Sequence, residues 1–229
     1  MNLLAIPMLL IIAAIVLVRY RASLTRRREA FITAYHFPPS ISHKVKAKYP
    51  HLTEEQQALV IEGLKEYFQI CRQAGRTLVS MPSQVVDVAW HEFILFTHAY
   101  REFCHRALGR FLHHTPAQAM KTPTLAQQGI KRAWHIACTR EGIDPKTPAR
   151  LPLLFAIDAQ LGIPDGFKYS LDCQGAGTDY YCATHIGCAS GCAGDSSCNS
   201  SSCDSDSSGC DSGSGDCGGS CGGGCGGGD

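Results

Sequence analysis

The amino-terminal segment is an unbroken apolar run from Leu3 to Val18, and five arginines follow it between Arg19 and Arg28. At about 1.5 Å per residue, a helix over such a run measures roughly 24 Å, close to the thickness of a hydrocarbon core. The pattern predicts a transmembrane anchor over residues 1–19. A basic juxtamembrane helix or linker over residues 20–37 then follows.

A cleaved signal peptide is the alternative interpretation of this apolar run. Signal peptides carry positive charge before the apolar segment and small residues at a cleavage site after it. Here the charge follows the run, and no Ala-x-Ala pattern precedes the arginines. The pattern favours a single-pass anchor in the inner or plasma membrane. The positive-inside rule then places the amino terminus outside and the rest of the chain in the cytoplasm.

Beyond the proline pair at residues 38–39, apolar positions recur with helical spacing through residue 170, and no useful period-2 pattern appears. Thr53 with Gln56 forms a capping-box pattern, and Ser83 is a candidate amino-terminal cap. We therefore predict an all-α fold in which an N-terminal transmembrane helix precedes a small globular bundle of about five helices over residues 38–170. The predicted bundle helices span about 53–75, 84–95, 98–108, 124–140 and 151–161.

The carboxy-terminal tail, residues 171–229, is rich in Gly, Ser, Cys and Asp and holds few large aliphatic residues. It cannot bury enough apolar surface to offset its chain entropy, so we expect disorder. All 21 Lys and Arg lie at or before Lys168, whereas eight Asp and no basic residue follow it. The basic excess lies beside the anchor and not in a stripe with aromatics, so we expect no nucleic-acid partner; a protein partner stays open.

The chain contains 13 cysteines, and ten of them follow residue 172. In a cytoplasmic chain we expect reduced thiols. The tail has no C-x2-C spacing, which disfavours a zinc ribbon. Its thiols can bind soft metal ions adaptively, or the tail can be a spacer without a ligand. The tail candidates are Cys188, Cys192, Cys217, Cys221 and Cys225.

Residues 81–116 hold five of the ten histidines. Asp87 and His91 are one helical turn apart, so the carboxylate can orient the imidazole. Tyr100 and Cys104 share a face of the following helix at the same spacing. A hairpin of the two helices would bring these residues together with Trp90 and the pair at positions 113 and 114.

Three interpretations of this stretch stay open. A zinc or other transition-metal site would use His91, Cys104, His113 and His114, although no His-Glu-x-x-His motif is present. A structural interpretation makes the same side chains part of an aromatic core. An enzyme would use Cys104 as a nucleophile or a metal-bound water. Of the other candidates, His98 and His105 are expected to be exposed, and His135 and Cys138 to lie in the core.

The order of these residues resembles the glycine-rich domain-containing protein family, whose short bacterial members end in Gly/Cys-rich tails. The resemblance implies signature positions without assigning them an activity. The signature positions are Asp87, Trp90, His91, Tyr100, Cys104, His113 and His114.

These patterns together predict a membrane-anchored cytoplasmic helical module, non-enzymatic, that binds a protein partner or senses metal through its His/Cys cluster. The alternative is a metal-dependent or cysteine-based enzyme that uses the same cluster.

Overall fold

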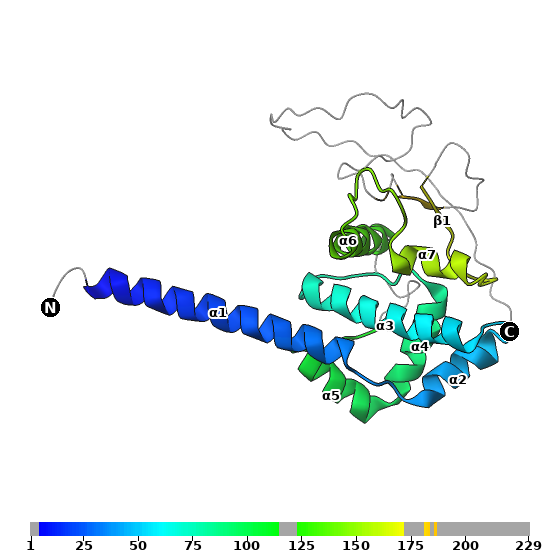
Figure 1. The fold of residues 1–229 in the computed structure, drawn as a ribbon, viewed down its shortest axis with the longest axis horizontal. Coiled ribbons are helices and arrows are strands. Elements are labelled where there is room, and N and C mark those ends of the chain that lie inside the picture. The colour runs from blue at the N-terminus through cyan, green and yellow to red at the C-terminus, as the bar shows by residue number, and fades with distance from the viewer. Residues whose placement is uncertain (1–4, 115–122, 172–180, 184–185, 187–229) are drawn as a thin grey trace, which may run out of the picture. The chain divides into compact units, whose positions relative to one another are not determined.

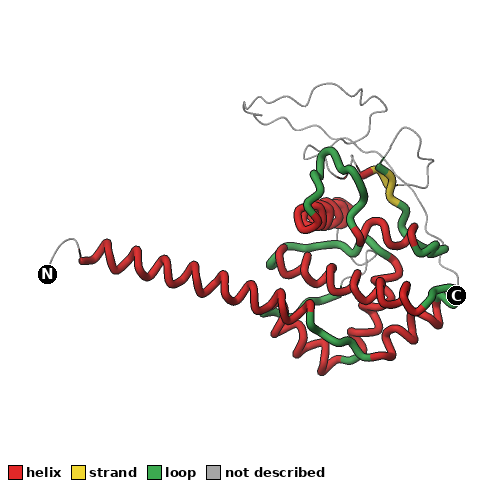
Figure 2. Tube along the Cα trace, viewed as in Figure 1, coloured by secondary structure: helices red, strands yellow, loops and turns green. Residues whose placement is uncertain are grey.

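The computed structural model describes residues 5–114, 123–171, 181–183 and 186. Within these residues the fold is all-α, as predicted, and the only strands are two residues long (Figures 1 and 2). These strands pair in parallel, with Tyr169 opposite Tyr181. The elements are α1 (Ala5–Thr33), α2 (Pro39–Lys48), α3 (Glu54–Ala74), α4 (Gln84–Leu95), α5 (Thr97–Leu108), α6 (Pro123–Glu141), α7 (Leu153–Gln160), β1 (Tyr169–Ser170) and β2 (Tyr181–Cys182).

Helix α3 is the centre of the bundle, because each of the other six helices contacts it. Its buried side chains recur every three or four residues, from Val60 through Leu64 and Phe68 to Cys71. Gly63 lies where α3 crosses α4 and α7. A Cβ atom there would come within 2.9 Å of Val86 Cγ2, so glycine permits this close crossing.

The predicted start of α3 and the predicted carboxy-terminal end of α5 are confirmed. The backbone N–H of Gln56 donates to Thr53 Oγ1 at 3.3 Å, and the Thr53 N–H donates to Gln56 Oε1 at 2.9 Å. This reciprocal pair satisfies two amide donors that a helix start leaves unpaired. Gly109 ends α5 in the left-handed conformation, with a φ of 70°.

Sequence periodicity missed one helix of the body. Helix α2 begins at Pro39, the second residue of the proline pair, and none of the predicted helices covers it. Proline is well suited to the first turn of a helix, where its missing N–H has no partner to lose. Only Ile41 and Val45 of α2 are buried, and this short stripe explains why the pattern was weak.

Helix α1 is continuous from the apolar segment into the body, and it runs without a break through the described part of the predicted anchor and through the predicted juxtamembrane segment as far as Thr33. It is long and apolar enough to cross a membrane, a length and composition that signal sequences share. The large apolar side chains from Met8 to Val18 are exposed. Its carboxy-terminal turns pack on α5 and α3 (Figure 1). There Phe31 packs on Phe103, and Gln69 donates to the carbonyl of Glu29 at 3.0 Å.

Most of the predicted disordered tail, including the five candidate tail thiols, lies outside the described residues. Cys182 is disulfide-bonded. This differs from the expectation of reduced thiols, which followed from the predicted cytoplasmic location alone. Cys71, Cys104 and Cys138 are free and buried.

Candidate metal centre

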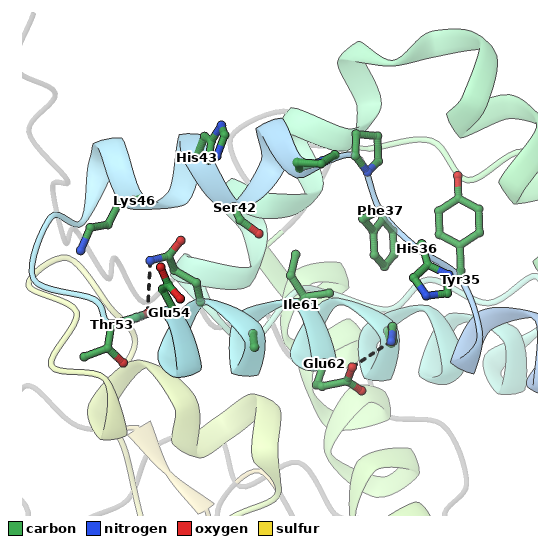
Figure 3. Close-up of a pocket in the computed structure, with 15 residues that line it drawn as sticks. Tyr35, His36, Phe37, Ser42, His43, Lys46, Thr53, Glu54, Ile61 and Glu62 are labelled. Carbon is green, nitrogen blue, oxygen red and sulfur yellow. Dashed lines mark hydrogen bonds and ion pairs between the residues drawn. The ribbon is translucent and has the colours of Figure 1, made fainter.

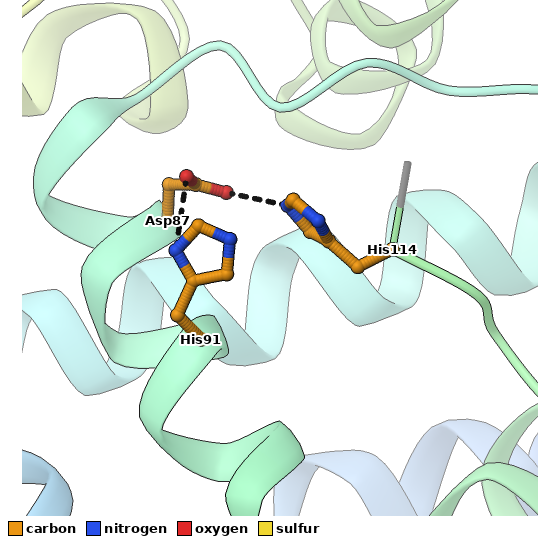
Figure 4. Close-up of side chains that lie close together, drawn as sticks. All are labelled: Asp87, His91 and His114. Carbon is orange, nitrogen blue, oxygen red and sulfur yellow. Dashed lines mark hydrogen bonds and ion pairs between the residues drawn. The ribbon is translucent and has the colours of Figure 1, made fainter. Parts of the chain in front are cut away.

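Three candidate ligands, Asp87, His91 and His114, come together at the surface of α4 (Figure 4). Asp87 Oδ2 lies 3.5 Å from His91 Nδ1, and Asp87 Oδ1 lies 3.4 Å from His114 Nε2. The two imidazole rings are 4.2 Å apart between centroids. One donor atom from each residue lies within 4.8 Å of the other two. The carboxylate thus faces both rings from one side, with one oxygen toward each.

Local sequence explains why two of these ligands share one face. Asp87 is in the first turn of α4, and His91 follows it by one turn. Ser83 caps this helix, as predicted, by accepting a hydrogen bond from the Val86 N–H at 3.2 Å. The capped first turn fixes the backbone that carries Asp87.

A buried carboxylate that sequence reasoning missed, Asp158 of α7, also holds the start of α4. Its Oδ1 accepts hydrogen bonds from Ser83 Oγ at 2.7 Å and from the Val85 N–H at 3.2 Å. Its Oδ2 accepts from the N–H groups of Gln84 at 2.7 Å and Phe167 at 2.9 Å. An anion at a helix amino terminus is favoured by the helix dipole and by free N–H donors. The sequence feature that could have predicted a buried role for Asp158 is its place as the one acidic residue of the apolar segment Leu153–Gln160.

His114 comes from the extended segment that follows α5, and two buried aromatic residues support it. The Trp90 indole N–H donates to Tyr100 Oη at 3.2 Å, and the Tyr100 hydroxyl donates to the Leu112 carbonyl at 2.6 Å. This chain of bonds ties the backbone two residues before His114 to α4 and α5. The Trp90 ring also packs against the His114 ring, 4.6 Å away between centroids. Trp90 and Tyr100 therefore position a ligand and are not ligands themselves.

Two of the four predicted metal ligands are not part of this cluster. Cys104 is fully buried, and burial raises the pKa of its thiol, which opposes the thiolate form that binds metal or attacks a substrate. His113 is exposed and packs on the ring of Phe111, 4.7 Å away between centroids. Neighbouring residues of an extended segment point to opposite sides, so only one of His113 and His114 can turn toward Asp87.

Of the remaining candidates, His98, His105 and Cys138 lie where they were expected, whereas His135 is less buried than its predicted place in the core. His98 and His105 are exposed on α5. Cys138 is buried, and burial raises the pKa of its thiol to about 11. His135 is partly buried on α6, one turn from Cys138.

The donor set and its spacing fit a transition-metal ion. Zinc binds histidine nitrogen and carboxylate oxygen at about 2.0–2.1 Å, and the donors of a tetrahedral site are therefore about 3.3 Å apart. The two Asp87 contacts, at 3.5 Å from Oδ2 and 3.4 Å from Oδ1, are close to this separation, and with one donor atom from each residue all three lie within 4.8 Å of one another. His91 has 51% of its side chain exposed, so its ring is free to turn toward His114. Three protein ligands would leave the fourth position to water.

A second feature is an open groove of about 820 Å³ between α2 and α3 (Figure 3). Tyr35 and Phe37 line one end of it, and Lys46 and Glu54 line the other. No ligand of the Asp87 cluster lines it. Its mixed charges, with Lys65 paired to Glu62 at 2.8 Å, give it no strong preference for an anion or a cation.

Comparison with known proteins assigns the chain to a family. The UCP032817-like family matches residues 27–188, which is more than half of the chain. The protein belongs to the UCP032817-like family. The resemblance to glycine-rich domain-containing proteins is therefore wrong: a Gly/Cys-rich tail and an aromatic-histidine stretch are compositional features that unrelated chains can share. The family description names no activity, and no curated protein or solved structure gives a significant match.

Proposed function

We propose that this protein binds a divalent transition-metal ion through Asp87, His91 and His114. The observation that carries the proposal is the convergence of three donor atoms within 4.8 Å of one another. Hydrogen bonds that hold the ligand-bearing segments in place also support the proposal. Asp158 fixes the helix that carries two ligands, and Tyr100 fixes the segment that carries the third.

The donor chemistry favours zinc, with other borderline ions as competitors. Imidazole nitrogen suits Zn²⁺, Cu²⁺, Ni²⁺ and Fe²⁺, whereas Mg²⁺ and Ca²⁺ prefer all-oxygen sites. Two histidines and one carboxylate also occur in catalytic zinc sites, which keep one position open. The alternative of a purely structural Asp–His cluster would need no ion, and the test below separates the two.

We further propose that α1 is a single-pass anchor in the inner or plasma membrane, with the amino terminus outside and the body in the cytoplasm. The exposed apolar surface of α1 and the arginines after it support this orientation. The disulfide at Cys182 argues for an oxidising compartment instead. Labelling of the tail cysteines from outside intact cells, after reduction with a membrane-impermeant phosphine, decides between them: protection supports the cytoplasmic location, and labelling overturns it.

The metal proposal is tested by elemental analysis of the full chain after the tail thiols have been alkylated under native conditions. Alkylation removes thiolate ligands and leaves the imidazoles and Asp87 available. We expect about one zinc per chain in the wild type and none in a His91→Ala/His114→Ala variant. The matched control is His98→Ala/His113→Ala, which removes two exposed histidines outside the cluster. Equal zinc in the two double variants would refute the proposal.

Catalysis by a metal-bound water is the second candidate function. The half-exposed His91 and a three-ligand donor set favour it, because a bound ion would keep a solvent-reachable position. A cysteine-based enzyme has less support, since the free thiols of the body are buried. A metal-dependent esterase or phosphatase activity, lost in the His91→Ala/His114→Ala variant and retained in the control variant, would support catalysis. Stoichiometric metal without any such activity favours sensing or storage.

A further inference from the structure

The carboxy-terminal ends of α3 and α5 meet beside α1 at the end of the body from which the apolar helix extends (Figure 1). Arg28 of α1 donates to the Leu108 carbonyl, the last residue of α5, at 3.4 Å. Arg110, just beyond α5, donates to the carbonyl of Gly75, just beyond α3, at 2.8 Å. These two hydrogen bonds place three chain segments at one end of the body.

This end of the body is strongly basic. Arg26, Arg27 and Arg76 are exposed, and Arg110 is partly exposed. No carboxylate partner is recorded for any of the four among the described residues. Two acids close to this end are engaged by other arginines: Glu29 by Arg72 at 3.6 Å and Arg140 at 3.8 Å, and Glu66 by Arg140 at 2.5 Å. We call Arg26, Arg27, Arg76 and Arg110 the basic face.

The continuous helix sets the distance of the basic face from a membrane. Arg28 follows Val18, the last residue of the apolar run, by ten positions. At about 1.5 Å per residue this is about 15 Å along the helix axis. The headgroup layer occupies about 5–8 Å of it. The remaining gap is comparable with the Debye length of about 8 Å at physiological ionic strength, and a helix tilt of about 20° brings one side of the body closer.

We propose that the basic face binds the headgroups of anionic phospholipids in the membrane that holds α1. The contact draws the ends of α3 and α5 onto the surface and fixes the tilt of the body. Arginines on α1 alone would serve membrane insertion, but Arg76 and Arg110 belong to the folded body and are not needed for it. The proposal rests on α1 being a membrane anchor.

The test uses the full chain in lipid nanodiscs, with zwitterionic lipid alone or with about one third anionic phosphatidylglycerol. Hydrogen–deuterium exchange is measured over residues 75–78 and 109–111. Each arginine near an anionic surface changes the docking equilibrium about fivefold, so Arg76→Gln/Arg110→Gln should weaken it about 25-fold. The matched control is Lys44→Gln/Lys146→Gln, which removes two exposed charges from other parts of the body.

We expect both segments to exchange more slowly in anionic discs, and the protection to be lost in the arginine double variant and at high salt. The control variant should keep it. Equal exchange of the wild type in both kinds of disc overturns the proposal without needing any variant. The proposal is also overturned if millimolar inorganic phosphate protects the two segments equally well in zwitterionic discs. The basic face would then be a general anion site. Failure of the chain to enter either disc would instead refute the anchor.

Discussion

The carboxylate of Asp158 is the most informative side chain to change, because it supports both the fold and the proposed metal site. In Asp158→Asn one carboxylate oxygen becomes an NH₂ group of nearly the same size. In place of Oδ2 the new NH₂ group faces two backbone donors, the N–H groups of Gln84 and Phe167. In place of Oδ1 it faces the Val85 N–H and the Ser83 hydroxyl, which can turn to accept. The substitution therefore loses one or two hydrogen bonds, and the charge that strengthens the others, without opening a cavity.

The expected loss follows from the number of bonds removed. At about 1.5–2 kcal/mol for each hydrogen bond to a charged group, one or two lost bonds cost about 2–4 kcal/mol of unfolding free energy. For a chain of this size we expect Tm to fall by roughly 4–15 °C. Because α4 carries Asp87 and His91, looser support should also weaken zinc binding by roughly tenfold. Thermal unfolding and zinc titration of the same preparation measure both effects.

The matched control is Asp165→Asn, which removes the charge that pairs with Lys48 at 2.9 Å at the surface and keeps a side-chain oxygen that can accept from the Tyr49 hydroxyl, now 2.8 Å from Asp165 Oδ1. Both partners of that pair are more than one third exposed, so its loss should cost less than about 1 kcal/mol. Equal losses of stability in Asp158→Asn and Asp165→Asn would refute the assignment of Asp158 as the buried cap of α4. If Asp158→Asn shows the predicted loss of stability but its zinc affinity is unchanged, only the role of Asp158 in supporting the metal site is refuted.

Three further predictions concern the core. Gly63→Ala should cost about 1–3 kcal/mol in denaturant unfolding, because the added methyl group meets Val86 Cγ2 at 2.9 Å; an unchanged midpoint would contradict that packing. Tyr100→Phe should cost about 1–2 kcal/mol and weaken zinc binding, since it leaves the Leu112 carbonyl without its donor; unaltered zinc affinity would separate Tyr100 from the site. Burial raises the pKa of the Cys71 thiol to about 12, so mass spectrometry should find it unmodified by iodoacetamide at pH 8 in the native chain and modified after unfolding. The stabilisation from keeping this thiol protonated is complete below its ordinary pKa of about 8.5 and is lost as the pH rises toward 12.

The fold was largely predictable because its helices carry local signals. The capping box at Thr53 and the left-handed Gly109 mark their helix ends in any context. Helix α2 lacked such a signal, since it begins at a proline and buries only two aliphatic side chains. Helices with such local signals can thus be predicted from the sequence, whereas a short helix that is stabilised by its neighbours cannot.

The candidate site was predictable only in part. The pairing of Asp87 with His91 follows from helical spacing, and in the structure Asp87 Oδ2 lies 3.5 Å from His91 Nδ1. The choice of His114 over His113 and Cys104 depends on which way an extended segment turns after α5. That direction is set by the bond from Tyr100 to the Leu112 carbonyl, a tertiary contact that no spacing rule contains.

The central claim is that two histidines and one carboxylate bind a transition-metal ion, and cobalt substitution tests it most directly. Co²⁺ is titrated into the full chain after native alkylation of its accessible thiols, and the visible spectrum is followed. We predict saturation at one equivalent with the intense bands of a tetrahedral site and without thiolate-to-cobalt charge transfer, and an affinity at least about 100-fold lower in His114→Ala than in His113→Ala. A spectrum of free hexaaqua cobalt, or equal affinities in the two variants, would contradict the account.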